Sequence, residues 1–193
     1  MRKGKSVMED SKIVDLYWER SESAIAETSS KYAKYCRYIS FNILHNQQDA
    51  EECVNDTYLR AWNSMPTQRP NRLSTYLGKI TRNLSINKYM GYTASKRGSG
   101  QVNLVLSELD ECVPSPESVE QSVDETLLLD TINCFLASLP RMNRIVFMRR
   151  YWYLSSIKEI AREYEMNENK VKSILFRLRN ELKLFLEKEG ITL

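Results

Sequence analysis

The chain has 193 residues and a formal net charge of +3, and 42% of its residues are hydrophobic. This length allows one large or two small domains with a buried core, and this composition excludes a chain that is disordered throughout. No apolar run approaches the roughly eighteen residues that span a bilayer, and residues 1–10 lack the apolar stretch of a signal peptide. The sequence therefore predicts a protein that does not insert into a membrane and acts in the cytoplasm.

Charge is arranged in three blocks along the chain. Residues 57–100 include basic but no acidic side chains, residues 101–130 include acidic but no basic ones, and residues 141–188 have a basic surplus. Two basic surfaces separated by an acidic stretch are typical of a protein that contacts a polyanion twice. Charged faces that are merely solvated are the alternative that charge alone leaves open.

The residue usage favours helices and free thiols. Only six Gly and five Pro occur in the chain, and both residue types disfavour helix interiors. The four cysteines are Cys36, Cys53, Cys112 and Cys134. They are widely spaced and form no Cys-x-x-Cys pair, so we predict free thiols in a reducing compartment, with neither a metal site nor a cofactor.

The first half of the chain is predicted to form a helical domain over residues 11–95. Apolar spacing predicts helices over 11–20, 24–44, 49–65 and 73–90. Pro66 and Pro70 end the third helix and begin a loop over 64–72.

The predicted helix 49–65 carries a second stripe opposite its buried face. The stripe consists of Glu52, Asn55, Asp56, Leu59 and Asn63. An exposed leucine among acidic and polar residues is typical of a docking surface. A solvated face with an Asp56–Arg60 pair is the alternative, and a metal site that includes His45 would lack a second His.

The predicted helix 73–90 has a polar face suited to nucleic acid. Thr75, Lys79, Arg82 and Asn83 lie away from the apolar stripe on a helical wheel, with Asn87 at the edge. Lys and Arg bind phosphates, while an Asn amide offers both a donor and an acceptor to a base edge.

Residues 96–123 are predicted to form a flexible acidic linker. The composition is small and basic near residue 100 and then becomes acidic, and Pro114 and Pro116 oppose any regular element.

The second domain is predicted over residues 124–188. Its helices are expected over 124–139, 141–151, 156–165 and 168–188. The last two helices have the pattern of a helix-turn-helix, in which Asn167 caps the second helix. The exposed face of that helix consists of Asn169, Lys170, Lys172, Ser173 and Arg177. These side chains suit the major groove of DNA, although any amphipathic helical hairpin shares part of the pattern.

Together these segments resemble bacterial RNA polymerase sigma factors of the sigma-70 family, and among them the extracytoplasmic-function (ECF) type. Leu139-Pro140, Arg149-Arg150-Tyr151, Ile160-Ala161 and Val171-Lys172-Ser173 resemble sigma region 4, while Asp49 to Trp62 and Leu73 to Asn87 resemble sigma region 2. The resemblance implies an all-α fold, with a region 2 helical bundle and a region 4 helix-turn-helix joined by a flexible acidic linker.

The resemblance also implies a role for each surface. The stripe on 49–65 is expected to bind core RNA polymerase, the polar face of 73–90 the −10 element of promoter DNA, and the helix 168–188 the −35 element. An anti-sigma factor is implied as a further partner, and no catalytic residue is. Where the family usually has Gly in the turn, this chain has Glu165, which must adopt the same conformation without the freedom of glycine. Leu73, Tyr76 and Gly78 stand where the family usually has aromatic residues, which leaves fewer rings to stack on bases.

Two other functions stay open from the residues alone. A stand-alone helix-turn-helix regulator would bind its operator tightly without polymerase. A metal-dependent nucleic-acid enzyme would use Asp49, Glu51, Glu52 and Asp56 around a divalent ion.

Overall fold

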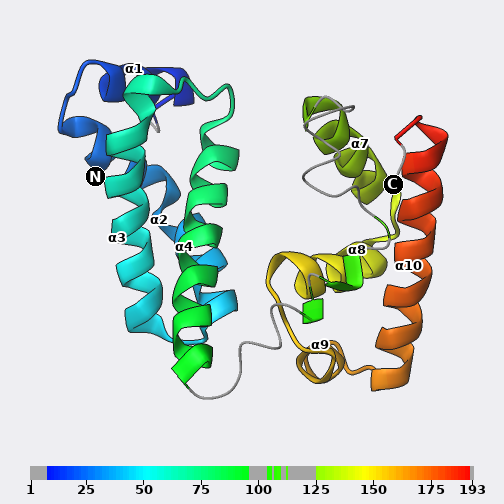
Figure 1. The fold of residues 1–193 in the computed structure, drawn as a ribbon. Coiled ribbons are helices and arrows are strands. Elements are labelled where there is room, and N and C mark those ends of the chain that lie inside the picture. Colours follow the sequence, from blue (N-terminus) through cyan, green and yellow to red (C-terminus); the bar gives the residue numbers. More distant parts are fainter. Residues whose placement is uncertain (1–7, 96–103, 106, 110–111, 113–124, 192–193) are drawn as a thin grey trace, which may run out of the picture. The chain divides into compact units, whose positions relative to one another are not determined.

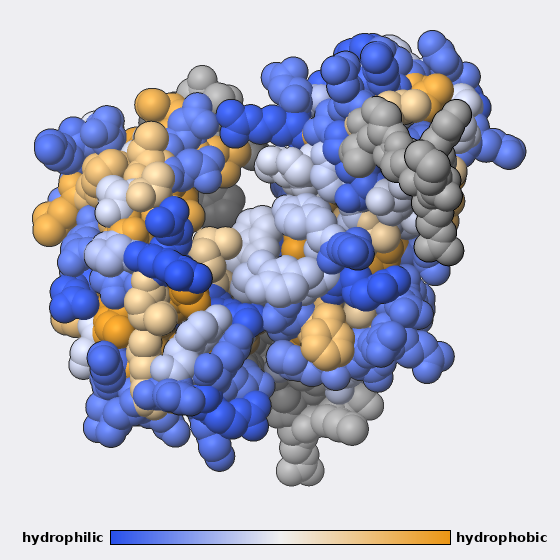
Figure 2. Space-filling model, turned by 180° about the vertical axis from the view of Figure 1, so that it is seen from behind, coloured by the Kyte–Doolittle hydropathy of each residue, from blue (hydrophilic) through white to orange (hydrophobic). Residues whose placement is uncertain are grey.

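The structure, a computed structural model, describes residues 8–95, 104–105, 107–109, 112 and 125–191. The chain divides into two compact units, Met1–Lys96 and Arg97–Leu193. Every regular element among the described residues is helical (Figure 1), which confirms the all-α prediction. No helix in this part of the chain is both long and apolar enough to cross a bilayer. Hydrophilic residues cover most of the face drawn in Figure 2, and hydrophobic ones form small separate groups on it.

The N-terminal unit is a bundle of three long helices closed at one end by a short one. Its elements are α1 (Asp10–Trp18), α2 (Ser23–Leu44), α3 (Gln47–Ser64), the 3₁₀ turn η1 (Met65–Thr67) and α4 (Leu73–Ser95). Helices α2, α3 and α4 lie side by side, with α1 across one end (Figure 1). Tyr17, Met65 and Leu73 are completely buried where α1 meets the bundle.

Small hydroxyl residues let the three long helices approach closely. Thr57 of α3 donates to Thr81 of α4 over 3.0 Å, and Ser85 of α4 donates to Ser40 of α2 over 2.8 Å. All four side chains are fully buried. Because each hydroxyl has a partner, the core contains these polar groups without the cost of unsatisfied hydrogen bonds.

The C-terminal unit packs shorter helices around one long one. Its elements are α7 (Glu125–Ser138), α8 (Arg141–Phe147), the π-helix η2 (Met148–Trp152), α9 (Ile157–Glu163) and α10 (Glu168–Lys188). The buried stripe of α10 consists of Val171, Ile174, Leu175, Leu178, Leu182 and Leu186. Phe147 links this core to α7 and η2, with its ring centroid 6.2 Å from Phe135 and 4.6 Å from Tyr151.

Helix bounds agree with the prediction where local signals are strong and differ elsewhere. Helix α10 has the predicted bounds. Helix α3 begins two residues earlier than predicted, because Asn46 caps it by accepting a hydrogen bond from the Asp49 amide at 3.2 Å. The predicted helix 141–151 is α-helical only to Phe147 and continues as a π turn, which Tyr153 closes by donating to the Met148 carbonyl at 3.1 Å.

Part of the predicted linker is structured. Most of it lies outside the described residues, but residues 104–105 and 107–109 are helical, where the sequence predicts no regular element. Val105 and Cys112 are buried. The prediction missed this turn because it is stabilised by contacts with the C-terminal unit rather than by local propensity.

Glu108 makes the decisive contact of this segment. Its carboxylate accepts two hydrogen bonds from the Arg150 guanidinium, and the one from Nε is 3.2 Å long. It also accepts a hydrogen bond of 3.1 Å from the Tyr151 hydroxyl, and Arg179 Nη1 lies 3.5 Å away. Arg150 is only 3% exposed and also donates to the Ser155 carbonyl at 3.1 Å. Glu108 therefore supplies the counter-charge for an arginine inside the C-terminal unit.

The pKa values around Glu108 reflect these bonds. Burial raises the pKa of the Glu108 carboxyl, but the hydrogen bonds and charges of Arg150 and Arg179 more than offset this, so its pKa lies below the usual range. Burial is the main cause that raises the pKa of Tyr151 to about 12. At neutral pH, Glu108 is therefore ionised and the Tyr151 hydroxyl stays protonated as a donor.

Candidate functional site

The helix-turn-helix is defined by two well-formed caps. Ser156 and Glu159 form a capping box at the start of α9, with hydrogen bonds of 2.7 and 3.2 Å. The Asn167 side chain accepts from the Asn169 amide at 2.8 Å, which confirms the predicted cap of α10. These caps fix where both helices begin, and hence which residues of α10 lie in its first turns.

The turn between α9 and α10 contains a strained residue. Glu165 has φ 51°, in the left-handed region. This is the conformation expected at the position where the resembled family usually has Gly. The next amide, of Met166, donates to the Ala161 carbonyl at 2.8 Å and closes the turn. A side chain at such a φ costs free energy that glycine avoids.

Replacing Glu165 with Gly is therefore expected to stabilise the C-terminal unit by about 0.5–1 kcal/mol, because the relief of strain outweighs the larger entropy of the unfolded glycine chain. Differential scanning calorimetry should show Tm rising by about 2–6 °C. Arg162→Gly, inside α9, is the matched control and should instead lower the stability by about 1 kcal/mol. A lower Tm for both variants would contradict the role given to the Glu165 backbone.

The exposed face of α10 holds all five residues predicted to read DNA. Asn169, Lys170, Lys172, Ser173 and Arg177 are exposed. The Ser173 hydroxyl donates to the Asn169 carbonyl at 2.9 Å, and Arg177 lies 3.7 Å from Glu181. The first contact is internal to the helix and the second is a weak surface pair, so neither blocks an approaching phosphate. The DNA-binding role of these residues stays a prediction.

Sequence reasoning missed Phe176 on the same face. Its side chain is 61% exposed, although it is a large hydrophobic residue. The signal in the sequence is its spacing, because Phe176 follows Asn169 and Ser173 at helical intervals. An aromatic ring in this position can contact the methyl group of thymine.

The polar face of α4 is present, with one difference. Thr75, Lys79, Asn83 and Asn87 are exposed, whereas Arg82 is half-buried. Burial lowers the pKa of the Arg82 guanidinium, which nevertheless stays protonated at neutral pH. The side chain of Arg82 is therefore partly desolvated, which the helical wheel did not predict.

A small pocket lies between α1 and the loop that precedes α4. It has a volume of about 260 Å³ and is lined by Asp10, Ser11, Val14, Arg69, Pro70 and Asn71. Arg69 is held in place by an ion pair with Asp15 and lies 5.6 Å from the centre of the Trp18 ring. The loop is thus anchored to α1 while its polar groups line the pocket.

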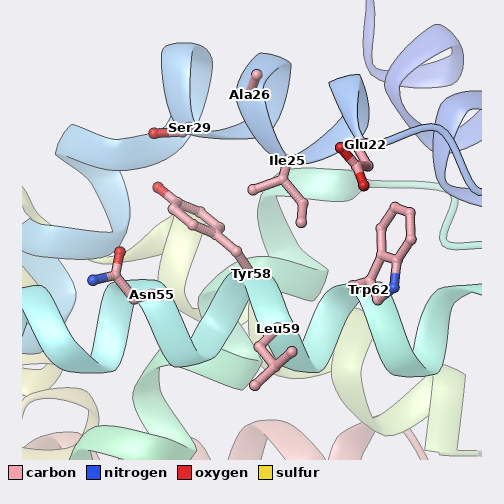
Figure 3. Close-up of a pocket in the computed structure, with 8 residues that line it drawn as sticks. All are labelled: Glu22, Ile25, Ala26, Ser29, Asn55, Tyr58, Leu59 and Trp62. Atoms are coloured by element: carbon pink, nitrogen blue, oxygen red, sulfur yellow. The ribbon is translucent and has the colours of Figure 1, made fainter.

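The stripe predicted on α3 adjoins a groove between α2 and α3. The groove has a volume of about 660 Å³, and its lining consists of Glu22, Ile25, Ala26, Ser29, Asn55, Tyr58, Leu59 and Trp62. Tyr58 and Trp62 point toward α2, whereas Leu59 points away from it and is 58% exposed (Figure 3). The sequence predicted Asn55 and Leu59 in this surface but not the α2 side, which exists only once the two helices pack.

Tyr58 is unusual in this groove. Its side chain is only 6% exposed, and its hydroxyl has no hydrogen-bond partner among the described residues. A buried hydroxyl without a partner costs free energy in the free protein. The hydroxyl is thus enclosed between α2 and α3 and is not displayed on the groove.

The acidic residues of α3 are partly engaged with α4. Lys88 donates to Glu52 over 2.6 Å and lies 3.2 Å from Asp49. Although burial opposes it, these two carboxylates raise the pKa of Lys88. In contrast, three further residues of the stripe are exposed, namely Asn55, Asp56 and Asn63. Asp56 forms no ion pair among the described residues, so the alternative Asp56–Arg60 pair is not formed.

The same lysine bears on the metal-dependent enzyme hypothesis. Its ammonium group lies between Asp49 and Glu52, where that hypothesis needs a divalent ion. No group of three His, Cys, Asp or Glu side chains in the described ranges could hold a metal ion. All four cysteines are free thiols, as the sequence predicted.

Comparison with known proteins gives matches in both units. The models of the families "Sigma-70 region 2" and "Sigma-70, region 4" match residues 29–93 and 129–182. The chain is 31% identical over 150 residues to the ECF RNA polymerase sigma factor SigL of Mycobacterium tuberculosis, a match that covers 74% of this chain and 77% of SigL. It is 23% identical over 152 residues to the ECF RNA polymerase sigma factor SigE of Mycolicibacterium smegmatis, covering 79% of this chain and 57% of SigE.

Proposed function

The chain belongs to the extracytoplasmic-function type of the sigma-70 family, and from this membership we propose that three surfaces divide the work of promoter recognition. Sigma factors are transcription initiation factors rather than enzymes. The chain is accordingly a promoter-specificity factor that binds core RNA polymerase and directs initiation. The proposal concerns which residues perform each step.

The first surface is the exposed face of α10, which binds the −35 element as duplex DNA. The capped start of α10 is the observation that carries this assignment, because it presents Asn169, Lys172 and Ser173 on one side within the first two turns. Asn and Lys can reach base edges there, while Arg177 further along holds a phosphate.

Replacing Lys172 and Arg177 together with Ala is expected to weaken binding of the polymerase–sigma complex to a −35 duplex. If each contacts one phosphate, the slope of log K against log salt concentration should fall by about 1.8. Fluorescence anisotropy at several salt concentrations measures both effects. Lys188→Ala is the control, because Lys188 lies about 16 Å further along the helix than Arg177. An unchanged slope in the double variant would remove α10 from the duplex contact.

The second surface is the exposed face of α4 with the adjoining loop, which binds the −10 element. Lys79 supplies a cation, and the amides of Asn83 and Asn87 can pair with base edges. The pocket beside Arg69 and Asn71 is lined by groups that can hydrogen-bond a base displaced from the stack. The loop is fixed to α1, so a displaced base would meet a preformed surface.

The third surface is the groove between α2 and α3 with its exposed Leu59, and it docks on core RNA polymerase. An apolar groove next to an exposed leucine fits the centre of a protein interface. Ile25 and Trp62 supply apolar surface beside the exposed Leu59. Removing this apolar surface from water favours docking over solvation.

A binding comparison separates this function from a stand-alone regulator. The sigma function predicts weak promoter binding by the chain alone and a large gain when core polymerase is added. Tight duplex binding that core polymerase does not change would contradict it and favour the regulator. Because promoter DNA and polymerase share one compartment, the proposal places the chain in the bacterial cytoplasm, where an anti-sigma protein would compete for the same surfaces.

A further inference from the structure

A face of α2 carries aromatic and basic residues that none of the three surfaces uses. Tyr35, Tyr38 and Phe41 are 40%, 53% and 46% exposed. Each follows the previous one by three residues, and Lys34 lies one turn before Tyr38. No acidic residue occurs between Glu27 and Asp49. We call the four residues Lys34, Tyr35, Tyr38 and Phe41 the α2 face.

Helix α4 contacts the Tyr35 ring at a glycine, Gly78. A Cβ atom at Gly78 would lie only 2.6 Å from the Tyr35 hydroxyl oxygen and 3.3 Å from its Cζ atom. Glycine inside a helix is less stable than alanine, so its presence at this buried position needs a reason. The missing side chain lets the Tyr35 ring lie against α4 at this position. At Tyr35, the α2 face therefore adjoins helix α4, which carries the proposed DNA-binding face.

Two of the three exposed rings, Tyr35 and Phe41, are held in a defined geometry. Tyr35 contacts Tyr32 edge to face with centroids 6.4 Å apart, and Phe41 contacts His45 in the same way at 6.4 Å. Tyr32 is fixed in turn because its hydroxyl donates to Asp10 at 2.6 Å. Rings that are already positioned lose little conformational entropy when a ligand stacks on them.

The cations of this region are unequally engaged. Lys31 lies 2.7 Å from Asp10, and Arg37 lies 3.9 Å from Glu51. Lys34 is exposed and forms no ion pair among the described residues, and the same holds for Lys79 on α4. Positive charge thus remains beside the exposed rings, and a phosphate chain is the complementary ligand.

We propose that the α2 face binds unpaired bases of single-stranded DNA, which stack on Tyr38 and Phe41 while Lys34 and Lys79 contact the phosphates. Duplex DNA does not fit this chemistry, because its base faces are covered by their neighbours, whereas every unpaired base exposes a π face. The inference rests on the proposed function only for the source of the strand, which is the melted promoter. It adds a stacking platform from α2 to a DNA-binding face assigned to α4.

The test measures binding of the full chain to a short fluorescein-labelled oligothymidylate by fluorescence anisotropy. Tyr38→Leu and Phe41→Leu should each weaken binding by about fivefold or more, because each removes a ring that stacks on a base. Tyr38→Phe keeps the ring and should bind as the natural chain does. Lys34→Gln should lower the slope of log K against log salt concentration by about 0.7.

The control is Tyr92→Leu, which removes an equally exposed ring whose hydroxyl donates to Asp49 of α3 at 2.9 Å, outside the α2 face. Circular dichroism melts verify that each variant is folded. Equal affinity of the natural chain and the Tyr38→Leu, Phe41→Leu double variant overturns the proposal, as does an equal loss in Tyr92→Leu.

Two further outcomes identify the cause of a failure. If the double variant loses affinity for core polymerase while oligothymidylate binding is unchanged, the α2 face contacts protein and the proposal is wrong. If the chain binds the oligonucleotide through these rings but does not initiate transcription with core polymerase, the inference stands and the proposed function fails.

Discussion

Replacing Glu108 with Ala is expected to lower the free energy of unfolding of the C-terminal unit by about 3–5 kcal/mol. The substitution leaves Arg150, which is 3% exposed, with a positive charge and no carboxylate partner. A buried charge that loses its partner destabilises a protein far more than a lost surface pair does. Native-state hydrogen exchange at the amides of α10, measured at increasing urea concentrations, gives the change in the free energy of unfolding.

Matched variants separate this effect from general surface changes. Glu181→Ala removes a solvent-exposed partner of Arg177 and should cost less than about 0.5 kcal/mol. The double variant Glu108→Met and Arg150→Met should recover much of the lost stability, because it removes both charges together. If Glu108→Ala behaves like Glu181→Ala, the contact does not contribute to stability.

The lowered pKa of Glu108 also gives the stability a pH dependence. A carboxyl whose pKa is lower in the folded than in the unfolded state contributes fully above its unfolded value, near 4.5, and loses the contribution as the pH falls through the folded value. The free energy of unfolding of the natural chain should therefore fall as the pH drops below about 4.5, and this fall should be smaller in Glu108→Gln.

Replacing Leu59 with Asp is expected to reduce the affinity for core RNA polymerase by about 100-fold while the chain stays folded. Leu59 is 58% exposed in the free protein, so the substitution creates neither a cavity nor a buried charge there. If the proposed docking surface is the one used, the substitution replaces an apolar contact with a desolvated carboxylate. Titration of labelled polymerase with the variant measures the loss.

The matched control is Leu184→Asp. Leu184 is 65% exposed, more than Leu59, but it lies on α10 and outside the proposed docking groove. The same chemical change there should leave the polymerase affinity within about threefold of the natural value. Full affinity in Leu59→Asp would show that the polymerase contact lies elsewhere on the chain.

The parts of the structure that the sequence predicted depend on local signals. The bounds of α10 were predicted because its apolar spacing is regular and Asn167 is a strong cap. The exposed stripe on α3 followed from periodicity in the same way. In both cases, residues close in sequence decide which side chains share a face.

The features that the sequence did not reveal depend on contacts between distant segments. Glu108 is 42 residues from Arg150, and no local pattern links them. The α2 side of the groove and the contact of Tyr35 with Gly78 exist only after two helices pack together. Arg82 is half-buried for a related reason, since a helical wheel represents one helix without its surroundings. Tertiary packing, not propensity, determines these features.

The position of Glu108 also bears on where this protein can be cut. The sequence predicts that the C-terminal domain begins at residue 124, but the counterion that its interior requires is supplied from residue 108. A fragment that starts at residue 124 would therefore lack it, whereas one that starts before residue 104 would retain it. Exchange of the C-terminal unit between relatives would then give a stable chimera only when the segment that contains Glu108 is transferred together with the helices of that unit.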